Sequence, residues 1–268
     1  MNEQLSGKVA VITGASMGIG EALAKLFAAA GAGVVMASRD VGRVEAARSR
    51  VGNSERTLAL ACDVRYREEV ERLLGLTLHN FGRVDLWINN AGHGLHDTVA
   101  EMDLAACREM FDTNLFGAIH GMQVAIPVML RQGGGTVVNI SSVAGHIPLP
   151  LGAAYSATKF ALNAIGKAAR LELKGTGVHV MTVCPGYIST GFKDHAVRGR
   201  SPLRLGSPVR GISAERVAQA VSRGYAKGKR EVVVPWRDRI FITLYQLWPA
   251  MVEHFMAKMI KPEEPSNK

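Results

Sequence analysis

The sequence predicts an α/β fold in which helices cover both faces of a doubly wound parallel sheet of about seven strands. Short runs rich in Val and Ile recur along the chain, and stretches with helical periodicity separate them. Most of these runs lack alternation of apolar and polar residues, which is typical of strands buried on both faces of a parallel sheet. The repeated alternation of strand and helix therefore favours one doubly wound domain.

The elements follow from this pattern in chain order. The expected strands are Val9–Thr13, Val34–Ser38, Thr57–Cys62, Val84–Asn89, Thr136–Ser141, Val178–Cys184 and Glu231–Val234. The expected helices are Ile19–Ala30, Arg43–Arg50, Arg67–Phe81, Leu104–Leu130, Ala153–Leu173 and Ala214–Ala226. We expect residues 1–235 to form one domain that carries the functional site, and residues 236–268 to form a hydrophobic helical appendage of that domain.

The composition indicates a globular protein of a reducing compartment. Hydrophobic residues make up 47% of the 268 residues and charged residues 21%, which excludes a disordered chain. Cys62, Cys107 and Cys184 are far apart and lack the spacing of a metal or redox motif, so we expect three reduced thiols. The N-terminus leads directly into a strand without a signal-peptide pattern, and together these observations predict a cytoplasmic protein.

The net charge of +9 suits several kinds of anionic partner, including a phosphorylated ligand and an anionic membrane surface. Nucleic acid is not expected, because the Lys and Arg residues are spread along the chain without a matching motif. No run of about 18 uninterrupted apolar residues occurs, so the sequence predicts no transmembrane helix.

A glycine-rich turn follows the first strand, from Thr13 to Gly20. Glycines there let the backbone approach a pyrophosphate, while the N-terminus of the next helix supplies N–H donors. Glycine also serves ordinary strand-to-helix turns, but the position of this turn after the first strand favours dinucleotide binding. The residues expected to contact the dinucleotide are Gly14, Ser16, Met17, Gly18, Ile19 and Gly20.

The end of the second strand, Ser38, Arg39 and Asp40, bears on the choice between NAD and NADP. An acid at this point binds the ribose hydroxyl of NAD, whereas an arginine accommodates the additional phosphate of NADP. Ser38 leaves room for a phosphate, and Arg39 offers a planar, bidentate partner. The alternative is that Arg39 is a solvated loop residue and that Asp40 reaches the ribose. Because Asp40 lies beyond the strand end, we expect NADP(H) as the cofactor.

A tyrosine and a lysine at a spacing of four, Tyr155 and Lys159, lie at the start of an expected helix. This spacing places both on one helix face, where the ammonium would lower the pKa of the tyrosine and favour acid/base chemistry. Ser142 follows the strand Thr136–Ser141, so its hydroxyl is placed to hydrogen-bond a substrate oxygen. A tyrosine–lysine pair alone is a common accident, so the assignment depends on the accompanying motifs.

The complete set of motifs resembles that of the short-chain dehydrogenase/reductases, in the compact branch of the family. The matches occur in family order and are Thr13–Gly20, Asp63-Val64, Asn89–Gly92, Asn114, Ser142, Tyr155 with Lys159, and Pro185-Gly186 with Thr190. The resemblance implies a Rossmann-like, dinucleotide-binding domain and an enzyme that acts on CH–OH groups, and the residues at the end of the second strand make NADP the expected dinucleotide.

The resemblance also implies roles for residues around the cofactor. Asp63 and Val64 would flank the adenine, with the Asp63 carboxylate accepting a hydrogen bond from its amine. Next to the nicotinamide we expect Asn90, Ala91, Gly92, Pro185, Gly186, Ile188 and Thr190. Taken alone, Pro185-Gly186 could be a simple strand-ending turn.

Asn114 and Lys159 would form a proton relay in such a protein. The resemblance implies that Asn114 shapes a local helix distortion and anchors a water that leads to Lys159, which would also hold the nicotinamide ribose. On its own, Asn114 is as easily an ordinary helix residue. His93 and His96 are expected to be loop histidines, and no third ligand at useful spacing supports a metal.

These observations predict an oxidoreductase that transfers a hydride between NADP(H) and an alcohol/carbonyl pair. The apolar segment Val143–Leu151 and the loop Tyr187–Arg210 favour a lipophilic ketone or aldehyde as substrate. Two alternatives remain open. A non-catalytic NADP-binding sensor or scaffold would not need an acid/base tyrosine, and an epimerase or dehydratase of this fold would have a longer chain after the last strand.

The last expectations concern partners. Relatives associate through two long helices, so we expect a homodimer or homotetramer built on Leu104–Leu130 and Ala153–Leu173. In the appendage, Pro249 should divide the apolar segment into two short helices. The apolar residues of 236–260 would cover the substrate cleft, meet a partner subunit or contact a membrane surface peripherally.

Overall fold

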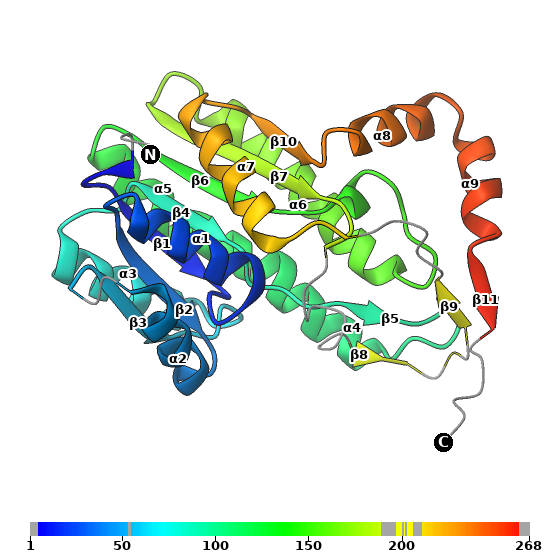
Figure 1. Cartoon of the computed structure of the whole chain (residues 1–268), viewed down its shortest axis with the longest axis horizontal. Coiled ribbons are helices and arrows are strands. Elements are labelled where there is room, and N and C mark those ends of the chain that lie inside the picture. The colour runs from blue at the N-terminus through cyan, green and yellow to red at the C-terminus, as the bar shows by residue number, and fades with distance from the viewer. Residues whose placement is uncertain are drawn as a thin grey trace.

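The computed structural model describes residues 5–52, 55–188, 197–199, 201, 203–205 and 211–262. A seven-stranded parallel sheet forms its centre (Figure 1). From one edge to the other the strands are β10 (Glu231–Val234), β7 (Val178–Pro185), β6 (Gly135–Ile140), β4 (Leu86–Asn89), β1 (Val9–Thr13), β2 (Gly33–Ser38) and β3 (Thr57–Ala61). The seven expected strands are all found, so the prediction of a doubly wound parallel sheet is confirmed.

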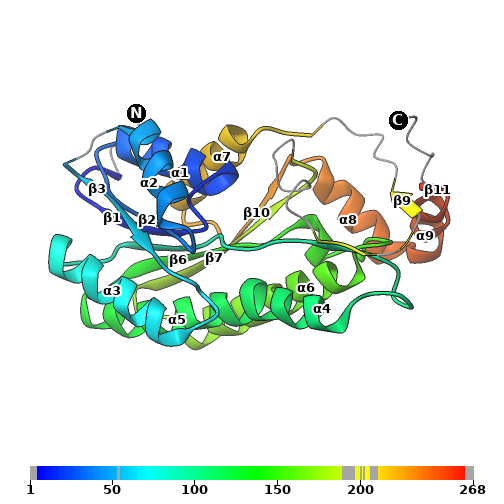
Figure 2. The same ribbon diagram turned by 90° about the horizontal axis from the view of Figure 1, so that it is seen from below.

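Helices cover both faces of the sheet, as Figure 2 shows. On one face lie α1 (Gly18–Ala29), α2 (Val41–Val51) and α7 (Ala214–Ala226). On the other lie α3 (Arg67–Phe81), α4 (Leu104–Phe111), α5 (Gly117–Arg131) and α6 (Ala153–Glu172). Each strand of the sheet runs in the same direction, so the carboxyl ends of β1, β4, β6 and β7 meet at one edge of the molecule.

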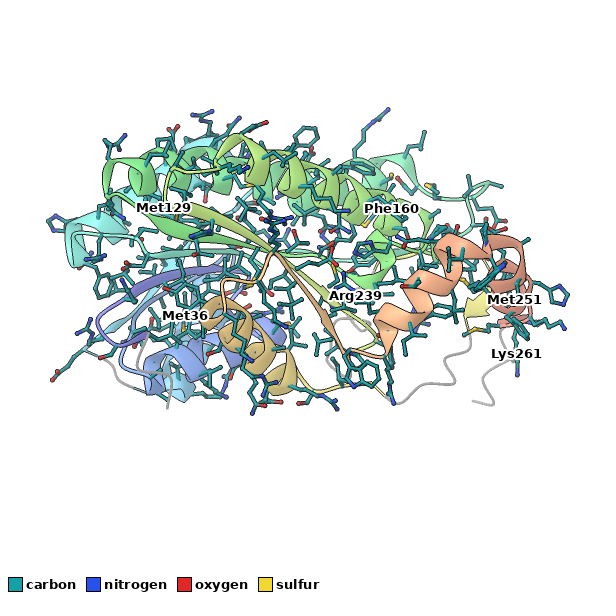
Figure 3. The ribbon with its side chains drawn as sticks, turned by 90° about the horizontal axis from the view of Figure 1, so that it is seen from above. Met36, Met129, Phe160, Arg239, Met251 and Lys261 are labelled. Carbon is teal, nitrogen blue, oxygen red and sulfur yellow. The ribbon has the colours of Figure 1, made fainter. Side chains whose placement is uncertain are left out.

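Two apolar layers, one on each face of the sheet, hold the helices in place. Successive residues of β1 point into opposite layers. Ile12 lies in the layer under α1 and α7, and Val11 lies in the layer under α3 and α5. Met36 and Met129 belong to these opposite layers and lie on opposite sides of the sheet in Figure 3. Burial on both faces explains why the strands read as continuous apolar runs.

The helical stretch Leu104–Arg131 is long and apolar enough to cross a membrane by length and composition alone. In the structure 61% of its most apolar window is buried, and α5 packs against β4 and β6. Packing on the sheet therefore accounts for its apolar composition. A π-helical turn, η2 (Asp112–Phe116), interrupts the stretch between α4 and α5.

The C-terminal segment forms α8 (Asp238–Leu247), α9 (Pro249–Ala257) and the short strand β11 (Ile260–Pro262). Pro249 divides the two helices, as the sequence predicted. Ile242, Val252 and Met256 from this segment form a small apolar cluster with Ile147. The appendage thus packs on the segment that follows β6, beside the carboxyl ends of the strands.

Four short strands join parts of the chain that are far apart in the sequence. Parallel pairing joins β5 (Leu95–His96) to β8 (Val197–Arg198), and antiparallel pairing joins β11 to β9 (Leu203–Leu205). All four lie at the same end of the molecule in Figure 1. The strand β11 thus pairs with the segment between β7 and α7.

Candidate active site

The glycine-rich turn between β1 and α1 has the backbone that a close-lying pyrophosphate requires. Gly14 and Gly18 have φ of 63° and 60°, in the left-handed region that favours glycine. A Cβ atom at Gly20 would lie 2.5 Å from the main-chain oxygen of Gly14 and 2.7 Å from Nδ2 of Asn90. Side chains at these positions would therefore distort the turn, and the turn fits a dinucleotide at the N-terminus of α1.

Asn90 and Thr13 fix this turn to the end of β4. The Asn90 side chain donates to the main-chain oxygens of Thr13 and Gly14, at 2.9 and 3.0 Å. The Thr13 hydroxyl accepts from the N–H groups of Asn90 and Ala91, at 3.0 and 3.1 Å. The Asn90–Gly92 motif thus adjoins the phosphate turn. Thr13 was part of the expected motif, but its bridging role could not be derived from the sequence.

At the end of β2 the structure brings together two predicted cofactor residues. The Ser38 hydroxyl donates to Oγ of Ser16, at 3.3 Å. Arg39 is 54% exposed at its side chain and pairs with Glu109 at 3.6 Å. The Asp40 carboxylate accepts from the N–H of Arg43 at 3.0 Å and is the N-cap of α2. The acidic residue is therefore used in capping, while the arginine extends into solvent.

Asp63 is an ionised acceptor that already has a partner. The main-chain N–H and the guanidinium of Arg65 donate to its carboxylate, at 2.6 to 3.1 Å. Burial raises the pKa of Asp63, but the hydrogen bonds from Arg65 outweigh it, and the pKa lies below its ordinary value. An adenine amine would share the carboxylate with Arg65. Val64, the other residue expected beside the adenine, is buried.

Asn114 lies at the centre of the π-helical turn η2 and is 1% exposed. Its Oδ1 accepts from the His93 N–H, and its Nδ2 donates to the His93 oxygen, each at 2.9 Å. Nδ2 also donates to Oγ1 of Thr158 at 3.3 Å. This π-helical turn is the helix distortion that the sequence led us to expect. Its wider winding directs the Asn114 carboxamide toward His93 in the loop after β4. The water relay through Asn114 stays a prediction.

Ser142 and Tyr155 face one another at the carboxyl ends of β6 and β7. Burial raises the pKa of Tyr155 to about 12, and a hydrogen bond with Ser142 acts in the opposite direction. The Ser142 hydroxyl also donates to the main-chain oxygen of Pro185 at 3.4 Å and accepts from the Ala144 N–H at 3.0 Å. Ser141 donates instead to the main-chain oxygen of Lys159 on the buried side, so Ser142 is the serine of the site.

Lys159 is 5% exposed and belongs to the same helix face as Tyr155. Its Nζ donates to the main-chain oxygen of Ile140 at 3.0 Å and lies 5.6 Å from the centroid of the Tyr155 ring. A Cβ at Gly92 would lie 3.0 Å from Oδ1 of Asn114 and 3.8 Å from Nζ of Lys159. The predicted relay residues thus gather around the strand-end loop.

The electrostatic expectation for this pair needs correction. The sequence led us to expect that the Lys159 ammonium lowers the pKa of Tyr155. In the structure burial dominates both groups: it raises the pKa of Tyr155 to about 12 and lowers the pKa of Lys159 to about 8. Removal from water disfavours the charged form of each group.

The segment after β7 is described in part. Gly186 donates its N–H to the main-chain oxygen of Val234 at 2.8 Å, and a Cβ there would collide with the carboxylate of Asp238. Ile188 forms an isolated bridge with Ile212. Thr190, expected to contact the cofactor, lies outside the described residues.

Comparisons with known proteins agree with this geometry. The family model described as short chain dehydrogenase matches residues 8–200. Dehydrogenase/reductase SDR family member 7B of Danio rerio is 30% identical over 97% of this chain and 87% of that protein. An uncharacterized oxidoreductase of Staphylococcus epidermidis is 34% identical over 68% of this chain and 79% of that protein.

Two solved structures share the whole fold. A short chain dehydrogenase/reductase from Burkholderia phymatum in complex with NAD has a TM-score of 0.82 and 26% identity, and covers 98% of this chain and 99% of its own. A short chain dehydrogenase from Burkholderia cenocepacia in complex with NADP has a TM-score of 0.80 and 26% identity, over 94% and 98%. The sheet order, the glycine turn and these matches show that the chain belongs to the short-chain dehydrogenase/reductase family of oxidoreductases.

Proposed function

We propose that this protein is an NADP(H)-dependent enzyme that interconverts a lipophilic alcohol and its ketone or aldehyde, chiefly by reduction. The observation that carries the proposal is the group formed by Ser142, Tyr155 and Lys159. The three side chains lie at the carboxyl ends of the strands, where ligands of open α/β sheets bind, and next to the Asn90–Gly92 loop.

The cofactor, when bound, supplies or accepts the hydride. In reduction Tyr155 donates its proton to the carbonyl oxygen, because its raised pKa keeps it protonated at neutral pH. The Ser142 hydroxyl stabilises that oxygen as negative charge develops. Lys159 supplies a positive charge on the same helix face while it is protonated. Oxidation uses the same groups in the opposite sense.

Two features support NADP(H) over NAD(H). Asp40 caps α2 and is thereby directed toward Arg43. Ser16 and Ser38 present two hydroxyls to the end of β2, and the Arg39 guanidinium, which pairs with Glu109, is 54% exposed. Two hydroxyls and an arginine suit a phosphate, whereas the Asp40 carboxylate is engaged in capping.

The surroundings of Ser142 support a lipophilic substrate. Val143, Ile147 and Leu149 follow it, and the apolar side chains of α8 and α9 pack on this segment. Exposed large apolar side chains on α8 and α9, and at the residue between them, include Phe241, Leu247, Trp248, Met251 and Phe255. We infer that this appendage borders the substrate site, and that contact with a membrane or a partner subunit is a further role to be tested.

We also propose a cytoplasmic homo-oligomer. Phe116 and Phe160, 47% and 41% exposed, lie on the outer helices of one face, and Leu104 and Leu130 are exposed on the same helical stretch. Apolar side chains of this size suit an interface between subunits. Light scattering at micromolar concentration tests the proposal, and a monomeric mass would contradict it.

The experiment that tests the reaction is a panel of hydrophobic ketones and aldehydes, assayed by oxidation of NADPH and of NADH. Tyr155→Phe should lower the rate about 10²- to 10⁴-fold, the usual contribution of a general acid, and leave the affinity for NADPH nearly unchanged. Tyr225→Phe, a half-buried tyrosine on α7, is the matched control and should retain the rate. Near-normal turnover in Tyr155→Phe would exclude the assignment.

A further inference from the structure

His146, Cys184 and Glu231 form a cluster that the hydride-transfer chemistry does not use. They come from three separate elements: the turn after η3 (Val143–Gly145), β7 and β10. Nε2 of His146 lies 3.4 Å from Sγ of Cys184 and 3.5 Å from Oε2 of Glu231. All three ligand atoms lie within 4.8 Å of one another. We propose that this cluster is a zinc-binding site.

The spacing fits a tetrahedral metal. Zinc takes Cys, His and carboxylate ligands at about 2.0–2.3 Å, which places neighbouring ligand atoms of a tetrahedron about 3.3–3.6 Å apart. The two measured distances from His146 Nε2 fall in this range. The donor set of thiolate, imidazole and carboxylate favours zinc over calcium or magnesium, which prefer oxygen ligands.

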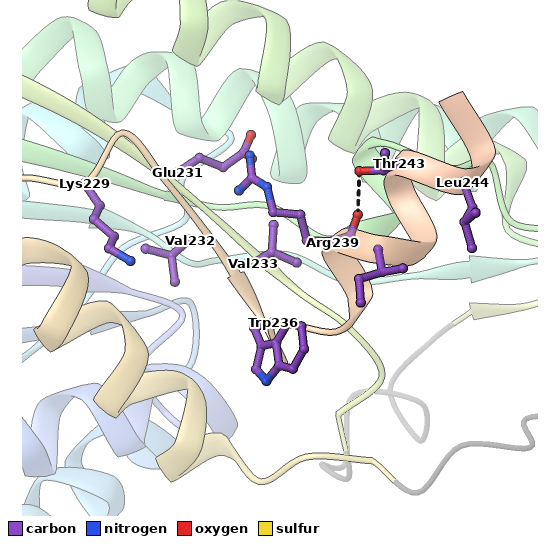
Figure 4. Close-up of a pocket in the computed structure, with 9 residues that line it drawn as sticks. Lys229, Glu231, Val232, Val233, Trp236, Arg239, Thr243 and Leu244 are labelled. Carbon is purple, nitrogen blue, oxygen red and sulfur yellow. Dashed lines mark hydrogen bonds and ion pairs between the residues drawn. The ribbon is translucent and has the colours of Figure 1, made fainter. Parts of the chain in front are cut away.

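The cluster is buried but reachable from solvent. The side chains of His146 and Glu231 are 10% and 19% exposed, and Cys184 is fully buried. Glu231 also lines a cavity of about 490 Å³ with Trp236 and Arg239 (Figure 4). A metal ion can therefore reach the cluster through this cavity, past the Glu231 side chain.

The amide of Asn163 lies at the same place. Its Nδ2 is 3.4 Å from Nε2 of His146 and donates to the Gly145 oxygen at 2.8 Å. Its Oδ1 is buried and has no hydrogen-bond partner among the residues that the structure describes. Because the donor Nδ2 rather than Oδ1 faces His146, Asn163 orients the imidazole, and a water would supply the fourth ligand.

Zinc binding requires a particular protonation state of Cys184 and His146. Burial raises the pKa of the Cys184 thiol to about 12, and burial lowers the pKa of His146 against the opposing charge of Glu231. Zinc binding therefore releases the thiol proton to solvent and uses a neutral imidazole. The thiolate and the carboxylate together match the charge of Zn²⁺.

The positive charge of Arg239 should lower the affinity of the cluster for zinc. Its guanidinium pairs with Oε1 of Glu231 at 3.3 Å, whereas Oε2 faces His146. Figure 4 shows the two side chains directed toward one another. Lys167, whose charge also acts on Cys184 and His146, adds to the opposition. Arg239→Gln should therefore bind zinc more tightly than the natural protein.

The test is titration of the full chain with Zn²⁺ by calorimetry, together with absorption spectroscopy of the Co²⁺ form. We expect one ion per chain and a thiolate-to-cobalt charge-transfer band. Cys184→Ser should abolish the band, and Cys184→Ser, His146→Gln and Glu231→Gln should each weaken zinc binding by about tenfold or more. The matched control is Cys62→Ser, which removes another buried cysteine outside the cluster and should bind like the natural protein.

Stability provides a second measurement. Zinc should raise the Tm of the natural protein and of Cys62→Ser, because the metal binds the folded state, and should raise it less in His146→Gln. If Cys184→Ser fails to fold, the histidine and glutamate variants still test the site. Absence of binding to the natural protein, a cobalt band that persists in Cys184→Ser, or equal affinity in all variants would overturn the proposal.

Discussion

The Asp40 carboxylate accepts a hydrogen bond from the Arg43 N–H at 3.0 Å and so caps α2. In an NAD-binding arrangement an acid at this edge of the sheet would face the ribose instead. In the function proposed above, Ser38 and Arg39 are the residues that select the cofactor. This relationship makes the cofactor preference testable at two residues.

The first prediction is that Ser38→Asp combined with Arg39→Leu shifts the preference from NADPH toward NADH. A charge-assisted hydrogen bond to phosphate contributes about 1.5–3 kcal/mol, or about ten- to a hundredfold in affinity. Fluorescence titration of both cofactors measures the change. Asp40→Ala is the control: it should lower stability through the lost cap, by about 1 kcal/mol, without changing the preference. A natural protein that binds NADH as tightly as NADPH would refute the prediction.

The second prediction concerns pH. Burial lowers the pKa of Lys159 to about 8, so its ammonium is present below this pH and is lost as the pH rises through it. We expect kcat/KM for reduction to fall above about pH 8, because the positive charge beside Tyr155 disappears.

Lys159→Arg keeps a positive charge at this position but removes the titration near pH 8. Arginine stays protonated throughout the accessible range, so this variant should be slower but should lack the decline above about pH 8. Initial rates of NADPH oxidation between about pH 6 and 10 measure both profiles. The same decline in Lys159→Arg would assign it to another group.

The third prediction concerns stability and acid. Asp85 is 6% exposed and accepts hydrogen bonds from Arg83 at 2.7 and 2.8 Å and from the Val9 N–H at 3.0 Å. Burial raises its pKa, but the hydrogen bonds from Arg83 and Val9 and the charge of Lys8 outweigh it, so the pKa is lowered. The stabilisation is therefore present above the unfolded pKa, near 3.9, and is lost as the pH falls through the folded value.

Asp85→Asn should lower the free energy of unfolding at pH 7 by about 1.5–3 kcal/mol, the contribution of hydrogen bonds to a charged group. The difference from the natural protein should shrink below about pH 4. Urea unfolding at several pH values measures it. Glu45→Gln, which removes an exposed pair with Arg48, is the control and should change stability little. A difference that is independent of pH would contradict the prediction.

The fourth prediction concerns the appendage. Truncation after Asp238 removes α8, α9 and β11, and should preserve NADPH binding but abolish activity on lipophilic substrates. The reason is that this segment packs on the residues after Ser142 and pairs with β9. Oligomer size and binding to anionic liposomes, measured on the same variant, show whether the segment also meets a subunit or a membrane.

Two point variants separate these roles. Ile242 is 5% exposed and belongs to the cluster with Ile147, whereas Ile240 is 53% exposed. Ile242→Ala should raise KM for lipophilic substrates, and Ile240→Ala should weaken only liposome binding or association of subunits. If the truncated protein keeps its substrates, oligomer size and liposome behaviour, the segment is only a covering for the core.

The seven long-range strands and the helices could be predicted because each element buries a continuous face, which the sequence records as a run or a period. The strands β5, β8, β9 and β11 could not. They hold two or three residues, and their pairing, such as Leu95 with Val197, depends on segments distant in the sequence. Too few residues are involved to produce a period.

Motif order led us to group Ser142, Tyr155 and Lys159, and the structure places them close together, but their electrostatics could not be predicted. The low pKa of Lys159 results from burial, which only the packed structure determines. The same holds for His146, Cys184 and Glu231, which have no common spacing and meet only because β7 and β10 are neighbours in the sheet.

The π-helical turn at Asp112–Phe116 makes the candidate active site sensitive to the number of residues in this helix. A π turn holds one residue more than the α-helical turn it replaces, so deleting one residue there would restore regular helix. The helix on one side of the deletion would rotate by about 100° relative to the helix on the other side. Asn114 would then lose its two hydrogen bonds to the His93 main chain. We therefore expect that, in natural variants of this helix, residues are exchanged but none are inserted or lost, whereas the exposed loop at Gly133 can change in length.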